Sequence, residues 1–288
     1  MKAVNGAMEV VFFGVRGSRP VTGARHLTYG GNTACVAVRA REKWLLFDAG
    51  SGITHAEQVL GENETIDLFL SHLHHDHVMG LMFFPAIHRR PADVAIHLHA
   101  SLLSSLEPYW SRPYFPMERG EACPPLRLVP LEDHVRMAWD GNRWSPCTDA
   151  PPLDRLCVEA KRLPRVAHPS DGVMIYKVMD SGRAVVYATD VELADEEIVR
   201  SVAEFARGAN LLICDAHFSD DEYEAYRGWG HSSIGMAVEL ARQAEVGRLA
   251  LFHHAPHRDD LAMEQLEREA RRAFDRALAA REGLRLFC

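Results

Sequence analysis

The stretch SHLHHDHVMG at residues 71–80 decides the fold, because it places His72, His74, Asp76 and His77 within six positions. The apolar, β-prone run at 66–70 predicts a buried strand that ends at the first histidine. In extended chain the first two histidines point to the same side, and the turn that follows can bring the other two ligands to a second point. Imidazole and carboxylate suit zinc, manganese or iron. The cluster therefore predicts two ligands for each of two metals, rather than a histidine-rich surface loop.

The composition is that of a globular protein with a substantial core: 288 residues, 47% hydrophobic and 25% charged. A net charge of -8 argues against a surface that coats nucleic acid, although a local basic patch stays open. No apolar run is long enough to span a bilayer, and residues 1–9 do not have the pattern of a signal peptide. The six cysteines are scattered without a C-x-x-C pair, so we expect reduced thiols in a cytoplasmic protein.

Four buried strands are predicted to end in a candidate ligand, and these ends lie at His72 and His74, at Asp190, at Asp215 and at His253. Because strand ends at one edge of a sheet converge, we expect these side chains to share a pocket. Two dications about 3.5–4 Å apart repel each other and need an anionic bridge, a role that suits Asp190. The spacing of residues supports only the first cluster, at 72–77.

Other segments are read from their patterns alone. The strand at 44–47 ends at Asp48, which either supports the neighbouring metal loop or caps a helix that begins near Ile53. His97 and His99 share one face of a predicted strand and are interpreted as packing or surface residues. Helices are expected from 78 to about 88 and at 194–207.

The last helix is predicted from about 260 to 281. Its buried stripe has i+4 spacing and consists of Leu266, Ala270, Phe274 and Leu278.

The segment at about 101–155 interleaves prolines with aromatic residues. We expect an ordered insertion, which serves either as a lid or binding loop or as a packing arm.

These motifs resemble the metallo-β-lactamase-fold hydrolases. HLHHDH at 72–77 matches the superfamily's H-x-H-x-D-H signature, and DAG at 48–50 matches its D-x-G strand end. Five further motifs resemble the phosphodiesterase branch, which includes ribonuclease Z-like and cyclic-nucleotide phosphodiesterase-like proteins: GVRGS at 14–18, YGGNT at 29–33, YATD at 187–190, GHSS at 230–233 and FHHAP at 252–256. The resemblance covers about 10–100 and 156–260. It implies an α/β (α+β) fold, a four-layer αβ/βα sandwich, as a single domain over residues 1–288.

The resemblance also implies a binuclear site that holds two divalent ions, with zinc expected and manganese or iron as alternatives. Asp190 would bridge the two ions. The other ligands would be His72, His74 and His168 for one ion, and Asp76, His77 and His253 for the other.

A hydroxide between the metals would then attack phosphorus in line with the leaving oxygen. The residues assigned to catalysis are Asp76, His231 and Asp215. His231 is expected to contact the phosphoryl oxygen or to protonate the leaving group, oriented by Asp215. The alternative for His231 is a residue at a helix start that is bonded to backbone.

Four further residues lie near these motifs in sequence. His217, His254 and His257 are predicted to support the site or lie at the surface rather than bind metal. Arg16 either reaches a substrate phosphate or forms a structural salt bridge.

We expect a small-molecule or nucleotide phosphodiester as substrate and no membrane partner. tRNA is not expected, because the chain has no equivalent of the Gly- and Lys-rich arm with which ribonuclease Z grips tRNA. The alternatives are a lactone or thioester hydrolase on the same bimetallic site, an iron-dependent oxidoreductase, and a binding protein with a degenerate site. A homodimer is the default oligomer, since dimers are the commonest.

Overall fold

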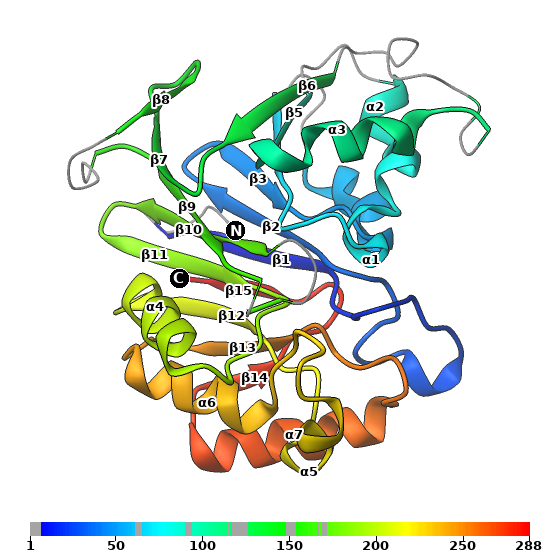
Figure 1. Cartoon of the computed structure of the whole chain (residues 1–288), viewed down its shortest axis with the longest axis vertical. Helices are drawn as coiled ribbons and strands as arrows, with labels where there is room; N and C mark the ends of the chain where they lie inside the picture. Colours follow the sequence, from blue (N-terminus) through cyan, green and yellow to red (C-terminus); the bar gives the residue numbers. More distant parts are fainter. Residues whose placement is uncertain are drawn as a thin grey trace.

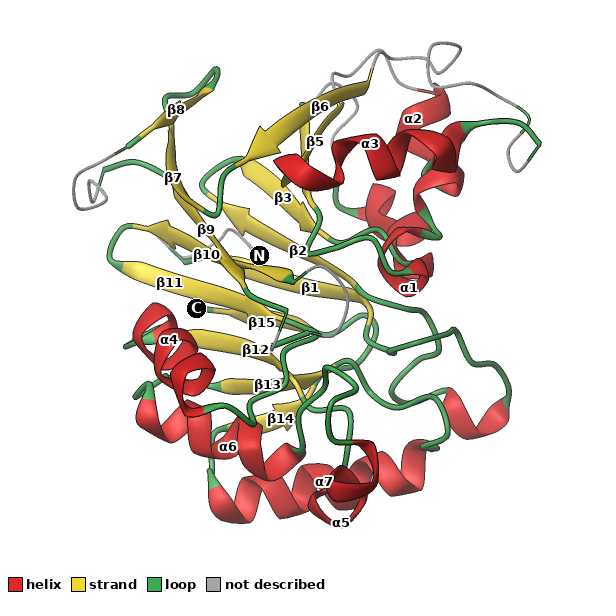
Figure 2. Cartoon of the chain, in the orientation of Figure 1, coloured by secondary structure: helices red, strands yellow, loops and turns green. Residues whose placement is uncertain are grey.

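The computed structural model of the chain describes residues 7–60, 65–89, 94–113, 116, 126–147, 154–165, 167–168 and 172–288. Two β-sheets pack face to face, and helices lie on their outer sides (Figures 1 and 2). This arrangement confirms the predicted four-layer sandwich.

The first sheet has the order β15-β1-β2-β3-β4-β5-β6. Its strands are β1 (Glu9–Gly14), β2 (Cys35–Ala40), β3 (Lys43–Phe47), β4 (Ile66–Phe69), β5 (Val94–His99), β6 (Leu126–Leu131) and β15 (Arg285–Phe287). The second sheet has the order β14-β13-β12-β11-β10-β9-β7-β8. Its strands are β7 (His134–Trp139), β8 (Trp144–Pro146), β9 (Cys157–Leu163), β10 (Val173–Asp180), β11 (Arg183–Ala188), β12 (Leu211–Asp215), β13 (Leu249–Phe252) and β14 (Ala277–Ala279).

The helices divide between the two outer layers (Figure 1). Beside the first sheet lie η2 (Ser51–Gln58), α1 (His75–Val78), η3 (Leu81–Phe83), α2 (Pro85–Arg89), η4 (Ala100–Leu102), α3 (Leu103–Leu106) and η5 (Glu107–Trp110). Beside the second sheet lie α4 (Glu196–Ala206), α6 (Ile234–Gln243) and α7 (Asp260–Ala273). Shorter elements in the connecting loops are η1 (Ala24–His26), α5 (Asp220–Tyr223) and η7 (Glu224–Tyr226).

An aromatic cluster fills the space between the sheets. Phe47 of the first sheet lies 5.5 Å from Tyr176 and 5.6 Å from Tyr187 of the second, measured between ring centroids. The two tyrosine hydroxyls also reach across to the first sheet, where one donates to the Leu70 carbonyl at 2.6 Å and the other to Asp48 at 2.7 Å. The core thus joins directly to the ends of β3 and β4.

Parallel pairing brings the carboxyl ends of several strands to one edge. In the first sheet β3 pairs in parallel with β4. In the second sheet β12 pairs in parallel with β11 and with β13. Because parallel strands end at the same edge, the residues that follow them are gathered there. That edge is where the candidate ligands were predicted to meet.

Two predicted helices are shorter than expected. The stretch from 78 to 88 is divided among α1, η3 and α2, because Gly80 and Pro85 interrupt it. The last helix ends at Ala273 rather than 281, since Phe274 has extended backbone angles and 277–279 pairs with β13. Tertiary pairing at the open edge of β13 therefore overrides the helical spacing.

The segment at 101–155 contributes to both sheets as far as it is described. It supplies β6 to the first sheet, beside β5, and β7 and β8 to the second. The residues at 114–115, 117–125 and 148–153 lie outside the described part of the chain. That the segment at 101–155 is an insertion stays a prediction, and so does the organisation of the chain as a single domain. Among the described residues, no helix has the length and apolar character needed to cross a membrane.

Candidate metal centre

Three residues at the converging strand ends have left-handed backbone conformations. Asp48 follows β3 with a φ of 58°, Asp190 follows β11 with a φ of 54°, and His253 follows β13 with a φ of 61°. Such angles cost about 1–3 kcal/mol each for residues with side chains, and they tend to cluster at functional sites. The ends of β3, β11 and β13 share this unusual geometry, which makes them a candidate site.

Asp190 lies between two groups of side chains. Its Oδ1 is 3.7 Å from Nε2 of His72 and 3.7 Å from Nε2 of His168. Its Oδ2 is 3.1 Å from Nε2 of His77 and 3.3 Å from Nε2 of His253. Each carboxylate oxygen therefore faces one pair of imidazoles, as a bridging ligand would.

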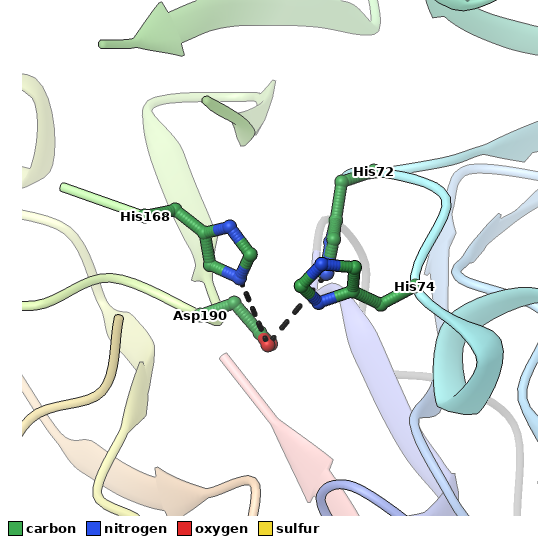
Figure 3. Close-up of side chains that lie close together, drawn as sticks. All are labelled: His72, His74, His168 and Asp190. Carbon is green, nitrogen blue, oxygen red and sulfur yellow. Dashed lines mark ion pairs between the residues drawn. The ribbon is translucent and has the colours of Figure 1, made fainter. Parts of the chain in front are cut away.

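The first group consists of His72, His74, His168 and Asp190, and each offers a ligand atom within 4.8 Å of the others. Figure 3 shows the three rings turned toward the Asp190 carboxylate. The rings come from two separate segments, because His72 and His74 follow β4 whereas His168 lies in the loop between β9 and β10. The predicted first ligand set is thus brought together.

The second group consists of Asp76, His77 and His253, whose ligand atoms also lie within 4.8 Å of one another. Oδ2 of Asp76 is 3.1 Å from Nε2 of His253 and 3.5 Å from Nε2 of His77. All three residues are buried. The predicted second set is therefore assembled as well.

One orphaned atom favours a cation at the first group. Nε2 of His72 is buried and has no hydrogen-bond partner among the described residues, while Nδ1 of the same ring lies 3.0 Å from the Ser71 hydroxyl. A buried polar atom without a partner costs about 1–3 kcal/mol. A divalent metal ion would satisfy this nitrogen, and the donor set of imidazoles and carboxylates is one that zinc, manganese and iron accept.

Asp48 fixes the orientation of one ring in the second group. Its Oδ2 accepts hydrogen bonds from Nδ1–H of His77 at 2.7 Å, from the Tyr187 hydroxyl at 2.7 Å and from the Ser71 hydroxyl at 2.8 Å. Its Oδ1 accepts from the Ser71 backbone N–H at 2.7 Å. Because the proton is held on Nδ1, Nε2 of His77 is left to face Asp190, as a metal ligand requires. Asp48 thus plays the supporting role, one of the two that its position suggested.

The two carboxylates of the cluster, Asp190 and Asp76, are held in their ionised form. Burial raises the pKa of Asp190, but His253, His77 and His72 outweigh it and hold that pKa well below its usual range. The pKa of Asp76 is likewise lowered, because His77 and His253 outweigh its burial. Burial, followed by the charge of His77, keeps the pKa of His72 well below its usual value, so this ring is neutral and able to bind a cation.

His231 and Asp215 form a pair beside the second group. Nδ1–H of His231 donates to Oδ2 of Asp215 at 2.9 Å, and the carboxylate also accepts from the Ser232 backbone N–H at 3.0 Å. Burial lowers the pKa of His231, but Asp215 outweighs it and raises this pKa to about 9. The ligand atoms of Asp215, His231, Asp190 and His253 all lie within 4.8 Å of one another. The two residues predicted to act with the metals are therefore in contact with the ligand set.

Arg16 and two histidines are placed away from the cluster. Arg16 is wholly buried and donates to the carbonyls of Gly30 and Arg258, both at 2.8 Å. These contacts give it a structural role, through backbone carbonyls rather than through the expected salt bridge. His254 is buried against the Ala280 carbonyl at 2.8 Å, and His257 is exposed and contacts Glu222.

His217 lies closer to the cluster. Its ring stacks on His231 at 4.5 Å, and its Nδ1 is 2.9 Å from the His253 carbonyl. Burial, followed by the charges of His231 and His253, lowers its pKa to about 2. Its role as a support rather than a ligand stays a prediction.

His97 forms a separate buried cluster at the start of β3 and β4. Its Nε2 is 2.7 Å from Asp67, whose other oxygen is 2.6 Å from Nζ of Lys43. Burial raises the pKa of Asp67, but His97 and Lys43 outweigh it and lower the pKa overall. His99 is buried too and bonds to Ser101 at 2.8 Å. Both histidines are packing residues, as expected.

In the glycine-rich loop after β1, the sequence pointed to Arg16, whereas Ser18 and Gly17 are the residues that contact the site. The backbone N–H of Ser18 donates to Oδ2 of Asp76 at 2.6 Å. A Cβ at Gly17 would lie 2.4 Å from the ring of His253, so only glycine fits there without a shift. The GVRGS motif was visible in the sequence, but these contacts join residues too distant in the chain for spacing to reveal them.

Residues 43–254 match the family model of the beta-lactamase superfamily domain. The chain belongs to the beta-lactamase superfamily. This assignment confirms the family and the fold that the sequence motifs predicted.

Relatives cover almost the whole chain of this superfamily member. A protein of Haloarcula marismortui named Ribonuclease Z is 28% identical over 96% of this chain and 96% of its own. Among solved structures, the metallo-beta-lactamase fold protein YhfI from Bacillus subtilis has a TM-score of 0.68 at 19% identity, with 99% of this chain and 100% of that chain covered. Human tRNase Z, short form, has a TM-score of 0.62 at 19% identity, with 96% and 98% covered.

These matches also bear on function. The family and the relative from Haloarcula marismortui confirm the prediction of a metal-dependent hydrolase of the phosphodiesterase type. One prediction is wrong, namely that tRNA is not expected as a partner. Several curated relatives of nearly equal length are named Ribonuclease Z. The prediction rested on a missing arm, and an arm is a peripheral feature that does not decide which bond the central site cleaves.

Proposed function

We propose that this superfamily member is a binuclear phosphodiesterase that cleaves an RNA phosphodiester, with precursor tRNA as the first substrate to test. The observation that carries the proposal is the division of the Asp190 carboxylate. One oxygen faces His72 and His168, and the other faces His77 and His253. The names of the relatives that span the whole chain support RNA as the substrate class.

The proposed ligands fall into two sets that share Asp190. They are His72, His74 and His168 for one ion, and Asp76, His77 and His253 for the other. Zinc is the metal that we propose, with manganese and iron as alternatives, because sets of imidazole and carboxylate ligands suit all three.

When bound, two divalent ions supply a water of lowered pKa and neutralise charge on the phosphoryl oxygens. The chain contributes orientation and a proton. Ser18 holds Asp76 through its backbone N–H, and Asp48 holds His77 through its Nδ1.

His231 is the residue that we assign to the leaving oxygen. With Nδ1–H bound to Asp215, its Nε2 is the nitrogen that can contact the phosphoryl group or give a proton to the departing alcohol. Asp215 also accepts a hydrogen bond from the Asp190 backbone N–H at 3.2 Å. One carboxylate thus sets the position of His231 relative to the proposed bridging ligand.

The experiment compares wild type with three variants, each loaded with zinc and tested on precursor tRNA and on bis(p-nitrophenyl) phosphate. We expect His74→Ala to lose bound zinc and cleavage together. We expect His231→Ala to keep its zinc and lose at least about 100-fold in kcat, as removal of an acid–base group does. His257→Ala is the matched control, because His257 is exposed and contacts Glu222 outside the cluster.

Two results would refute the proposal. The first is wild-type protein that binds zinc and cleaves neither diester but opens lactones or thioesters, which would make it a hydrolase of the alternative kind. The second is a His231→Ala variant with the wild-type rate, which would remove this residue from the reaction.

A further inference from the structure

Three aromatic rings lead from the metal centre to the surface. Phe218 lies 6.0 Å from His231 between ring centroids, and Tyr226 stacks on Phe218 at 4.8 Å with an interplanar angle of 4°. Trp229 then meets Tyr226 edge to face at 5.2 Å. Phe218 is buried, whereas Tyr226 is 37% and Trp229 is 63% exposed. We call these three residues the aromatic ladder.

A buried carboxylate fixes the loop that carries the outer rings. Glu192 is only 4% exposed and accepts hydrogen bonds from the backbone N–H of Gly228 at 2.7 Å and of Gly230 at 3.0 Å. The Tyr223 hydroxyl donates to it as well, at 2.8 Å. Because Glu192 comes two residues after Asp190, it ties the loop to the strand end that positions the proposed bridging ligand.

The two glycines need this loop shape. Gly228 has a φ of 88° and Gly230 a φ of 86°, values that residues with a side chain rarely adopt. Trp229 lies between them, so its backbone is constrained on both sides. An exposed tryptophan on a rigid loop loses little conformational entropy when a ligand packs on it.

Charge and size limit what the ladder can bind. Arg227 lies beside it, but its guanidinium is paired with Glu224 at 2.6 Å, so a phosphate would have to compete with that carboxylate. Two exposed rings also offer much less than the roughly 800 Å² that each partner buries in a stable protein interface. A small, flat, uncharged aromatic ligand fits better than a phosphate or a second protein.

We propose that the aromatic ladder is a stacking subsite for the nucleobase of the nucleotide that carries the leaving oxygen; this rests on the proposed function. The ladder begins at His231, the residue assigned to that oxygen, so a base attached to the departing nucleotide meets the ladder first. Stacking of bases on aromatic side chains tolerates every base, because each has a flat π-face. The subsite therefore contributes affinity for nucleotides without reading a sequence.

The test uses two short oligoribonucleotides that differ only in the nucleotide on the leaving side of the scissile phosphate, which is either normal or abasic. We expect Trp229→Ala to raise KM about tenfold for the normal substrate with little change in kcat, and to leave KM for the abasic substrate unchanged. Trp229→Phe should restore most of the affinity. Phe287→Ala is the control, because Phe287 is another exposed aromatic residue, 54% exposed on β15. It pairs with Glu9 at the start of β1, and the site lies beyond the other end of that strand.

A binding measurement separates this inference from the proposed function. In zinc-loaded protein, adenosine monophosphate should quench tryptophan fluorescence saturably, and the quenching should be lost in Trp229→Ala but kept in Phe287→Ala. Equal KM values for Trp229→Ala and wild type on the normal substrate would overturn the subsite and leave the phosphodiesterase standing. Wild-type protein that cleaves neither oligonucleotide would overturn the proposed function, and the quenching would then decide the subsite by itself.

Discussion

Substitution of Asp48 by asparagine tests how the protein orients its ligands. Asparagine keeps the side-chain shape and tolerates the left-handed φ of 58°. The carboxylate accepts three hydrogen bonds on Oδ2, from His77, Tyr187 and Ser71, and one on Oδ1, from the Ser71 backbone. An asparagine oxygen in the Oδ2 position would keep the first three. Its NH₂ group would then face the backbone N–H of Ser71, so two donors would oppose each other.

The magnitude follows from these contacts. A buried donor left unsatisfied costs about 1–3 kcal/mol, and loss of an outer carboxylate partner typically lowers metal affinity by about 10–100-fold. That change in affinity corresponds to about 1.4–2.7 kcal/mol. Because His77 lies with Asp76 and His253, the loss should fall on the ion that these three residues hold. The ion between His72, His74 and His168 should lose less affinity, because Asp48 reaches His72 only through the Ser71 hydroxyl.

The assay is competition of zinc-loaded protein with a chelator, followed by metal analysis at each chelator concentration. Wild type should release its two ions at high chelator, and Asp48→Asn should release one of them at about 10–100-fold lower chelator activity. Tyr187→Phe is the control, since it removes one donor to Asp48 but keeps both the charge of the carboxylate and its bond to His77. Equal weakening of both ions, or wild-type affinity in Asp48→Asn, would refute the reasoning.

Three further predictions concern positions outside the ligand set. Gly17→Ala should displace the His253 ring, because the new Cβ would lie 2.4 Å from it. We expect kcat to fall at least about tenfold while the circular dichroism spectrum stays unchanged. A wild-type kcat would contradict the prediction. Arg16→Met leaves the buried carbonyl of Arg258 and the half-buried carbonyl of Gly30 without their donor. Urea titration should therefore show at least about 1–3 kcal/mol lost from the free energy of unfolding, and a loss below about 1 kcal/mol would contradict this prediction. The pKa of Asp67 is lowered because its histidine and lysine neighbours outweigh its burial. The charged carboxylate therefore stabilises the fold above the unfolded pKa of about 4. This stabilisation is lost as the pH falls through the lower pKa of the folded state. Asp67→Asn should therefore be less stable than wild type at pH 7, in the presence of chelator, and differ little at about pH 2, whereas an equal difference at both values would show that the charge is irrelevant.

The central features of the site could be predicted from the sequence because they are local. The H-x-H-x-D-H pattern places four side chains within one turn after a strand, and apolar runs identified the strand ends at Asp190 and His253. His168 had no such signal, since it lies in a loop without a regular pattern, and only the resemblance pointed to it.

The remaining features depend on contacts between distant segments. Gly17 touches His253 across 236 positions of sequence, and Glu192 bonds to a loop that begins more than 30 residues later. No periodicity reports such contacts. The same reason explains the error in the last helix, where pairing of 277–279 with β13 replaced a helical turn that the spacing favoured.

The most direct test of the account is anomalous diffraction at the zinc edge from crystals of the zinc-loaded protein. We predict two peaks about 3.5–4 Å apart, one on each side of the Asp190 carboxylate. One peak should lie among His72, His74 and His168, and the other among Asp76, His77 and His253. A single peak, or two peaks that do not share Asp190, would contradict the binuclear site from which the proposed function is argued.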